Sequence, residues 1–234
     1  MAQTTPRKAV RKKAAGKAGD QGLSLTGRAY TNLEEMIVTL QLPPGSAVSE
    51  AALAQRLGIG RTPIREALQR LARERLVTIL PRRGIIVSEI NVKSQLRLLE
   101  VRREVERLVA KSAARRATQE EREHFLELAR RFEKSAKTND DVEFMRVDHE
   151  FNDLSVLAAR NEFAAGAMSL MHSLSRRFWY IHYKQAADMP LTAKLHADIA
   201  RGIAAGNEAA AGRAMDKLLD TVAKFTRDTV TTDF

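Results

Sequence analysis

Residues 60–84 read GRTPIREALQRLARERLVTILPRRG, and this stretch decides the fold of the N-terminal part of the chain. Its apolar side chains recur at i, i+3, i+4 and i+7, at Ile64, Ala67, Leu68 and Leu71. That spacing places them on one face of a helix. Arg65, Gln69 and Arg73 project from the opposite face, so the pattern predicts a helix that is anchored on one side and free on the other.

The start of this helix is predicted at Thr62, as N-cap, with Pro63 as the first helical residue. A helix start of this kind directs its unpaired N–H groups outward, where a phosphate can accept them. Arg61 and Arg65 are then expected to lie beside the edges of DNA bases.

Two further helices and a hairpin are predicted around it. A helix striped by Leu33, Met36, Ile37 and Leu40 ends before Pro43, and a Ser49 cap opens a second helix that runs to Leu57. Two β-branched runs, 77–80 and 85–87, flank the turn 81–84. Residues 23–90 are therefore expected to form a winged helix-turn-helix domain with three helices and a β-hairpin wing.

This domain resembles the GntR family of transcription regulators. The shared segments are PPG at 43–45, VSEAALA at 48–54, GRTPIREAL at 60–68 and PRRG at 81–84. The chain departs from the family pattern at Gly60, where a serine is usual, and at Arg75, where a glycine usually ends the recognition helix. The resemblance and the arginine pattern together assign the DNA contacts to Arg61, Thr62, Arg65, Gln69, Arg82, Arg83 and Gly84.

Charge and composition favour a nucleic-acid partner. Residues 1–22 hold six Lys or Arg and one Asp, and residues 23–90 hold nine Arg and no Lys. The planar guanidinium suits bidentate reading of guanine. Residues 1–22 are expected to be a disordered basic tail that follows phosphates, or equally an idle solubilising segment.

The remaining composition points to a cytoplasmic, two-domain bacterial protein. The 234 residues are 44% hydrophobic, which is enough for two cores, and the absence of cysteine excludes disulfides and thiolate metal sites. No apolar run approaches the ~20 residues that span a bilayer, so no membrane partner is expected.

Residues 91–234 are expected to form an antiparallel six-helix bundle for ligand binding and dimerisation. The first stripe runs through Leu98, Val101, Val105, Leu108 and Ser112, and the fourth through Leu170, Leu174, Phe178 and Ile181. A capping box at Thr118 and Glu121 opens the second helix, and Gly206 closes the fifth. The fold class is therefore mainly α.

Polar residues interrupt or border these stripes at Arg102, Asp148, Asn152, Arg177 and His196. Burying them unpaired would be costly, so they are expected either to meet in an effector pocket or to be satisfied one by one in the core. A small carboxylate is the expected effector, because the arginines would meet its charge.

The same region resembles the FCD domain of the FadR subfamily, whose Asp and three His residues bind a divalent metal. The matching positions hold Asp148, Asn152, His196 and Leu218. Only two of the four agree, although the Asn152 carbonyl suits a hard cation and His182 is a candidate substitute. One divalent metal ion therefore stays open as a cofactor, and the six-helix count favours the VanR-like branch.

The sequence is interpreted as a metabolite-responsive repressor, not an enzyme, that binds an inverted-repeat operator as a homodimer. Two alternatives stay open. A nucleoid architectural protein would bind all DNA alike, and a metal-dependent enzyme would need an activated water and a general base in the helical domain.

Overall fold

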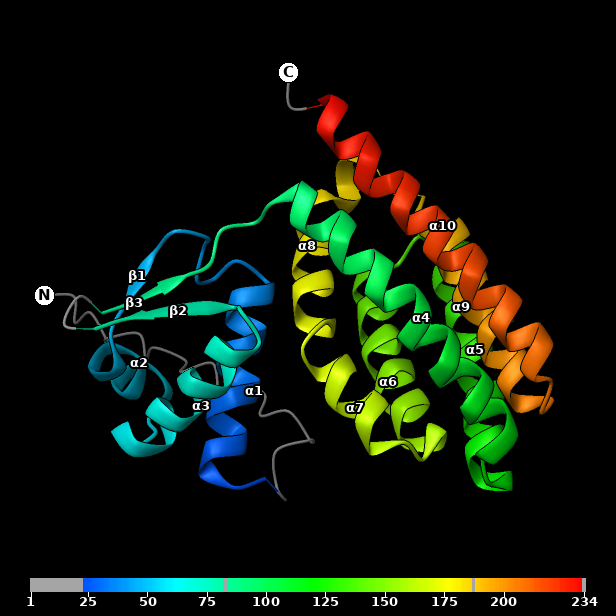
Figure 1. The fold of residues 1–234 in the computed structure, drawn as a ribbon, viewed down its shortest axis with the longest axis horizontal. Coiled ribbons are helices and arrows are strands. Elements are labelled where there is room, and N and C mark those ends of the chain that lie inside the picture. Colours follow the sequence, from blue (N-terminus) through cyan, green and yellow to red (C-terminus); the bar gives the residue numbers. More distant parts are fainter. Residues whose placement is uncertain (1–22, 82–83, 187, 233–234) are drawn as a thin grey trace, which may run out of the picture.

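The computed structural model describes residues 23–81, 84–186 and 188–232. Figure 1 shows two parts side by side, an N-terminal part of three helices and a small sheet, and a C-terminal part built of helices alone. The predicted basic tail, 1–22, lies outside the described residues.

The N-terminal part is a winged helix-turn-helix, as predicted. Its helices are α1 (Leu25–Val38), α2 (Glu50–Leu57) and α3 (Arg61–Arg73), and its strands are β1 (Ala47–Val48), β2 (Val77–Leu80) and β3 (Gly84–Val87). The sheet has the antiparallel order β1-β3-β2, with Val77 opposite Val87 and Leu80 opposite Gly84. β1 was not predicted, because two residues are too short to show an alternating pattern.

The core of this domain confirms the expected face of α3. Ile64, Ala67, Leu68 and Leu71 are buried against Leu33 and Ile37 of α1. Ser49 caps α2 by accepting the N–H of Ala52, also as predicted.

The predicted start of α3 is wrong. The N-cap is Gly60 rather than Thr62, and α3 begins at Arg61 without a side-chain cap. Pro63 is tolerated in the first turn because its missing N–H would have had no partner within the helix.

The end of α3 carries an unusual backbone. Arg75, where the family places glycine, has φ +61, and its N–H donates to the carbonyl of Ala72. A side chain in the left-handed region is strained, which explains why glycine suits this position.

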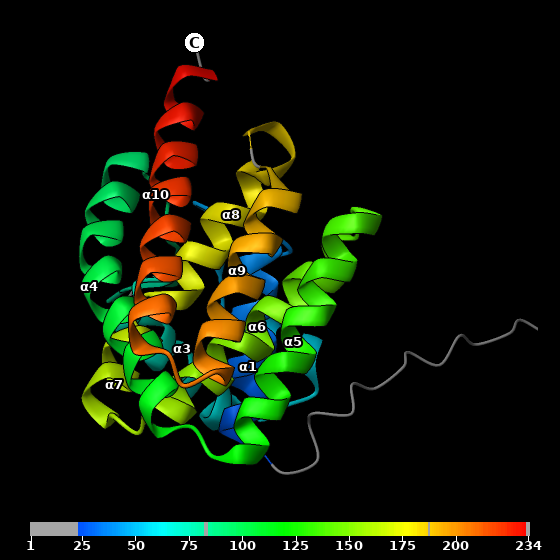
Figure 2. The same ribbon diagram turned by 90° about the vertical axis from the view of Figure 1, so that its right-hand side faces the viewer.

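The C-terminal part is a helical bundle. Its described helices are α4 (Val92–Arg116), α5 (Gln119–Thr138), α6 (Asp141–Ala159), α7 (Glu162–Ser169), α8 (His172–Ala186), α9 (Met189–Ala204) and α10 (Glu208–Thr232). Figure 2 shows α4 and α10 side by side, with α9 and α5 beyond them. The described bundle thus has one helix more than predicted, because the eight residues of α7 are too few to give a clear stripe.

The helix ends of the bundle agree with the sequence prediction better than its apolar stripes do. The capping box of Thr118 and Glu121 is confirmed, and Gly206, with φ +67, follows α9 as expected. The first stripe is confirmed in part: Ser112 is buried and Leu98 and Val105 pack against the core, whereas Val101 and Leu108 are 55% and 48% exposed. Leu170 is also exposed and precedes α8.

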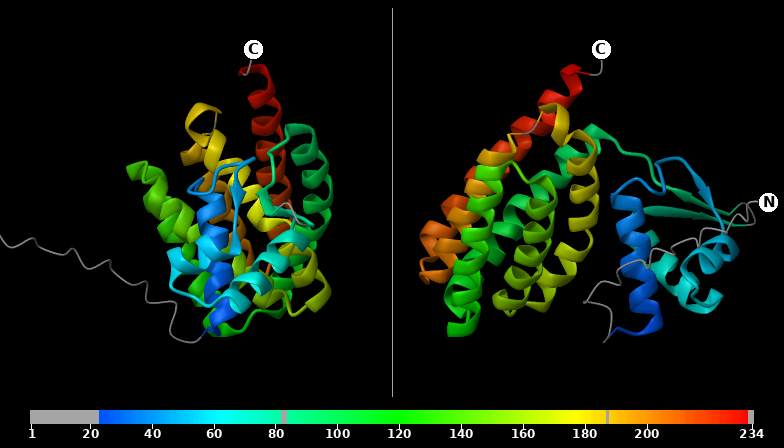
Figure 3. Two further views of the ribbon diagram at one scale, coloured as in Figure 1. Left: turned by 90° about the vertical axis from the view of Figure 1, so that its left-hand side faces the viewer. Right: turned by 180° about the vertical axis from the view of Figure 1, so that it is seen from behind.

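The two parts meet where α8 lies against α1, as both views of Figure 3 and the contacts between these helices indicate. Among the described residues, none of the helices combines the length and apolar character needed to cross a bilayer.

Candidate nucleic-acid interface and effector cavity

The outer face of α3 is polar and open. Arg61, Thr62, Arg65, Gln69 and Arg73 are all exposed there. Arg70 has a different position: its guanidinium lies 3.6 Å from the centre of the Tyr30 ring and pairs with Glu74 at 3.0 Å. Arg70 therefore attaches α3 to α1, whereas the other polar side chains of this face are exposed.

Arg65 is oriented by an acidic neighbour. Its Nε lies 2.9 and 3.1 Å from the two carboxylate oxygens of Glu50, and its Nη2 lies 2.8 Å from Oε2. The hydrogen bond from Arg65 lowers the pKa of Glu50 below its usual range, so the carboxylate stays charged at neutral pH. The Arg65 side chain is still 62% exposed.

Of the three expected DNA contacts in the wing, only Gly84 belongs to the described residues. Gly84 opens β3 with φ +100, a backbone conformation that favours glycine. The other two expected wing contacts, Arg82 and Arg83, lie outside the described residues.

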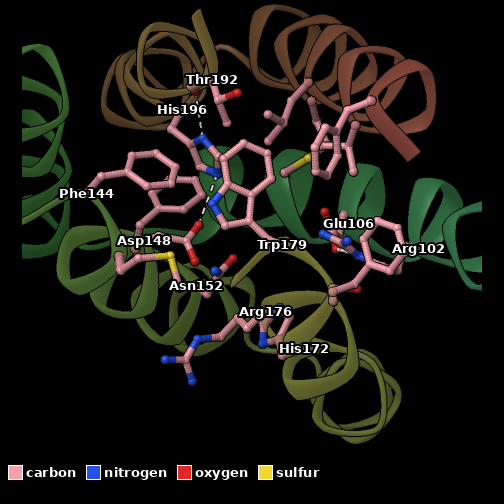
Figure 4. A pocket seen from close by; sticks show the side chains of 18 of the residues that line it. Arg102, Glu106, Phe144, Asp148, Asn152, His172, Arg176, Trp179, Thr192 and His196 are labelled. Atoms are coloured by element: carbon pink, nitrogen blue, oxygen red, sulfur yellow. Dashed lines mark hydrogen bonds and ion pairs between the residues drawn. The ribbon is translucent and has the colours of Figure 1, made fainter. Parts of the chain in front are cut away.

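A cavity of about 70 Å³ lies inside the helical bundle (Figure 4). Helices α4, α6, α8, α9 and α10 line it, and four of the five predicted effector residues reach it, namely Arg102, Asp148, Asn152 and His196. The predicted convergence of side chains from distant parts of the sequence is therefore present for these four.

His196 and Asp148 form the polar centre of the cavity. Nδ1 of His196 lies 2.8 Å from the carbonyl oxygen of Thr192, and Nε2 lies 3.1 Å from Oδ1 of Asp148 (Figure 4). The imidazole ring therefore lies between a backbone carbonyl oxygen and a carboxylate oxygen. Burial by itself would raise the pKa of Asp148, but the hydrogen bond and charge of His196 lower it overall.

Other polar groups complete the wall. Arg102 pairs with Glu106 at 2.5 Å, and the Ser175 hydroxyl has no hydrogen-bond partner among the described residues. His172 lines the same cavity, and burial lowers the pKa of its imidazole. A ligand would thus meet one unpaired hydroxyl and several charged groups that are already paired.

Arg177 is the predicted effector residue that the structure does not bring to the cavity. It is 2% exposed, and its guanidinium donates to the backbone carbonyls of Ser88 and Glu89, which connect the two domains. Burial lowers the pKa of Arg177 to about 10, so it remains charged at neutral pH. Arg177 therefore points away from the cavity that its neighbour Arg176 lines, because adjacent residues on a helix point about 100° apart.

Arg176, which sequence reasoning missed, occupies the position expected of Arg177. It lines the cavity, and in Figure 4 its guanidinium points away from His196. Its Nη1 lies 2.9 Å from Oε1 of Glu34 on α1, and both side chains are largely buried. The available signal was Glu34 itself, an acidic residue beside Leu33 in a buried stripe that required a partner.

The donor set does not fit the metal site implied by the resemblance. Leu218 lines the cavity with carbon atoms only, and the ring of His182 packs on Phe178. Among the described residues, no three His, Cys, Asp or Glu side chains gather closely enough to hold an ion. Of the expected ligands, Asp148, Asn152 and His196 line the cavity, but an amide oxygen is a weak ligand for a transition metal, so this set fits such an ion poorly.

A winged helix-turn-helix joined to a cavity-bearing helical bundle defines the class of two-domain bacterial regulators. The family model described as "Bacterial regulatory proteins, gntR family" matches residues 25–87, and the FCD domain model matches residues 97–221. The chain belongs to the gntR family, in the group that carries an FCD domain.

Individual relatives agree with this assignment. The chain is 30% identical over 152 residues to the Nta operon transcriptional regulator of Aminobacter aminovorans, covering 63% of this chain and 69% of that one. It is 24% identical over 198 residues to the HTH-type transcriptional repressor RspR of Escherichia coli, covering 85% and 87%. Two other regulators match at higher identity, 47% and 42%, but this chain covers only 26% and 44% of their lengths.

The solved structure of McbR/YncC from E. coli has the same fold, with a TM-score of 0.76 at 17% identity over 89% of this chain and 99% of that one. The prediction of a VanR-like branch depended on a six-helix count and on the shortness of the domain, and the described helical domain has seven helices. The helix count therefore no longer favours that branch.

Proposed function

We propose that this protein is a transcription regulator that binds an inverted-repeat operator as a homodimer and releases it when a small effector binds. α3 would enter the major groove, where the exposed Arg61, Arg65 and Gln69 can reach base edges. Arg82, Arg83 and Gly84 would place the wing on the adjacent backbone. The relatives' names are those of regulators, and the proposal assigns no catalytic role to the helical domain.

Dimerisation is assigned to the helical domain. Val101 and Leu108 leave two large apolar side chains exposed on α4, and a second copy of the chain would cover them. A two-fold dimer would present two α3 helices to the two halves of a palindromic site.

A small carboxylate is proposed as the effector. Two arginines line the cavity, Arg102 and Arg176, and either could meet the negative charge of a carboxylate. The free Ser175 hydroxyl adds a hydrogen-bond donor. The small volume favours a compact ligand over one the size of an acyl-CoA.

One observation supports the proposed release of the operator by the effector. Arg176 lines the cavity and also binds the DNA-binding domain through Glu34. An anion in the cavity would compete with Glu34 for this guanidinium. Such a ligand binds better when α1 has released Arg176, and this differential affinity is what a ligand needs to shift the position of the DNA-binding domain.

Selection of bound sequences from a random duplex pool tests the proposal. The purified full-length chain should enrich an inverted repeat, and compounds from a carboxylate collection that stabilise the protein should weaken that complex. Equal recovery of all sequences would refute the proposal and indicate an architectural DNA-binding protein instead.

A further inference from the structure

The ion pair between Glu50 and Arg65 lies on the face that would meet DNA, which is an unusual place for an acid. A carboxylate there repels phosphates and lowers affinity for every DNA sequence. Exposed ion pairs also contribute little to stability, and Glu50 and Arg65 keep 28% and 62% of their side-chain surface exposed. Neither affinity for DNA nor stability of the fold therefore explains why an acid lies on this face.

Glu50 instead fixes the orientation of the Arg65 guanidinium. The Glu50 carboxylate accepts hydrogen bonds from Nε and Nη2 of Arg65, with nitrogen-to-oxygen distances of 2.8 to 3.1 Å. A guanidinium has five N–H donors arranged in a plane. The edge formed by Nη1 and the second hydrogen of Nη2 remains, and it matches the O6 and N7 acceptors of guanine in the major groove.

Glu50 is held firmly enough to act as an anchor. It is the first residue of α2, where the N-terminal end of the helix favours a negative charge, and Ser49 caps the same turn. Gly58, with φ +64, makes the tight turn that brings α2 and α3 together. The anchor thus belongs to the rigid part of the helix-turn-helix rather than to a loop.

We propose that Glu50 is a specificity-determining residue, which holds Arg65 by one edge so that the opposite edge reads a guanine in the operator. The inference rests on the proposed function and deepens it. Glu50 then lowers affinity for DNA in general and raises discrimination between the operator and other sequences. An acid that merely competed with DNA for Arg65 would have the opposite effect on discrimination.

The test compares Glu50→Gln with a matched control, Glu66→Gln, which removes the same charge from the exposed face of α3. Fluorescence anisotropy gives the dissociation constants for the selected operator and for a random duplex of equal length at one salt concentration. Both variants should bind random DNA a few-fold more tightly. The ratio of random to operator dissociation constants should fall about tenfold for Glu50→Gln and stay unchanged for the control.

Two further measurements connect the effect to Arg65. In an Arg65→Ala background, Glu50→Gln should not change the ratio again. Replacing the contacted guanine by 7-deazaguanine should weaken wild-type binding and leave Glu50→Gln binding unaffected, a result that a general loss of fold would not give. An unchanged or increased ratio for Glu50→Gln would overturn the inference, and wild-type protein that selects no sequence would overturn the proposed function instead.

Discussion

The buried pair of Glu34 and Arg176 connects the candidate effector cavity to the DNA-binding domain, and Glu34→Gln tests its proposed role. The change removes one charge and keeps a side chain of the same size. If the pair holds the DNA-binding domain in its operator-binding position, the variant should resemble the effector-bound protein without any effector.

The size of the effect follows from the geometry. At 2.9 Å and an effective dielectric constant of about 20, the Coulomb attraction is about 6 kcal/mol before desolvation. The exposed fractions of 14% and 9% mean that much of this is offset by lost hydration, and hydrogen bonds to charged groups contribute about 1.5 to 3 kcal/mol net. We therefore expect Glu34→Gln to cost about 1.5 kcal/mol, which lowers Tm by about 3 to 6 °C in a chain of this length.

Operator affinity and thermal unfolding are measured for Glu34→Gln, Arg176→Met and the double variant. The two single changes should not add, and operator affinity should fall about fivefold to tenfold, within the usual range of coupling free energies. Glu35→Gln is the matched control, because its carboxylate lies 3.8 Å from the other terminal nitrogen of Arg176 and is more exposed. Additive effects, with operator binding equal to wild type, would refute the proposed coupling.

Four further predictions follow from single residues. Arg65→Ala should cost about 1 to 3 kcal/mol at the operator and little on random DNA, and equal losses measured by anisotropy on both would argue against sequence reading. Arg75→Gly should raise Tm by about 1 to 3 °C, because glycine relieves the strain at φ +61, whereas a lower Tm in calorimetry would show that the arginine side chain matters more. Because burial lowers the pKa of His172 in the folded chain, the unfolded chain takes up a proton first as the pH falls through about 6.5. The free energy of unfolding should therefore decrease below that pH and be fully retained above it, and His172→Asn should flatten this dependence in denaturant titrations. Elemental analysis of tag-free protein should find no stoichiometric divalent metal, since Asp148, Asn152 and His196 form a poor ligand set for a transition metal, and a chelator-removable ion at one per chain would contradict this.

Much of the fold could be predicted from local chemistry. The stripe of α3, the Ser49 cap and the Thr118 capping box are each decided within a few residues, so the sequence displays them directly. The exposure of Val101 and Leu108 on α4 could not be predicted, because an amphipathic pattern does not say which apolar residues at the edge of a stripe face solvent. The start of α3 was misplaced for a related reason: Thr62 and Gly60 are both acceptable N-caps, and only the backbone decides between them.

The candidate cavity was predictable in its centre and not at its edge. Asp148, Asn152 and His196 border apolar stripes of the bundle, so their convergence follows from packing those stripes together. Arg176 and Arg177 are adjacent in sequence, and choosing between them requires knowing where the DNA-binding domain sits relative to α8. Their roles depend on an interface between domains, which the periodicity of a single helix does not describe.

The two adjacent arginines of α8 also bear on hybrid regulators made by joining domains from different family members. Arg177 donates hydrogen bonds to the main-chain carbonyls of Ser88 and Glu89. A DNA-binding domain from another family member would supply such carbonyls whatever its sequence. Arg176 binds the Glu34 side chain, so a replacement domain without an acid at that position should attach normally but not respond to the proposed effector. Grafting an acid at that one position should be enough to restore communication in such a chimera.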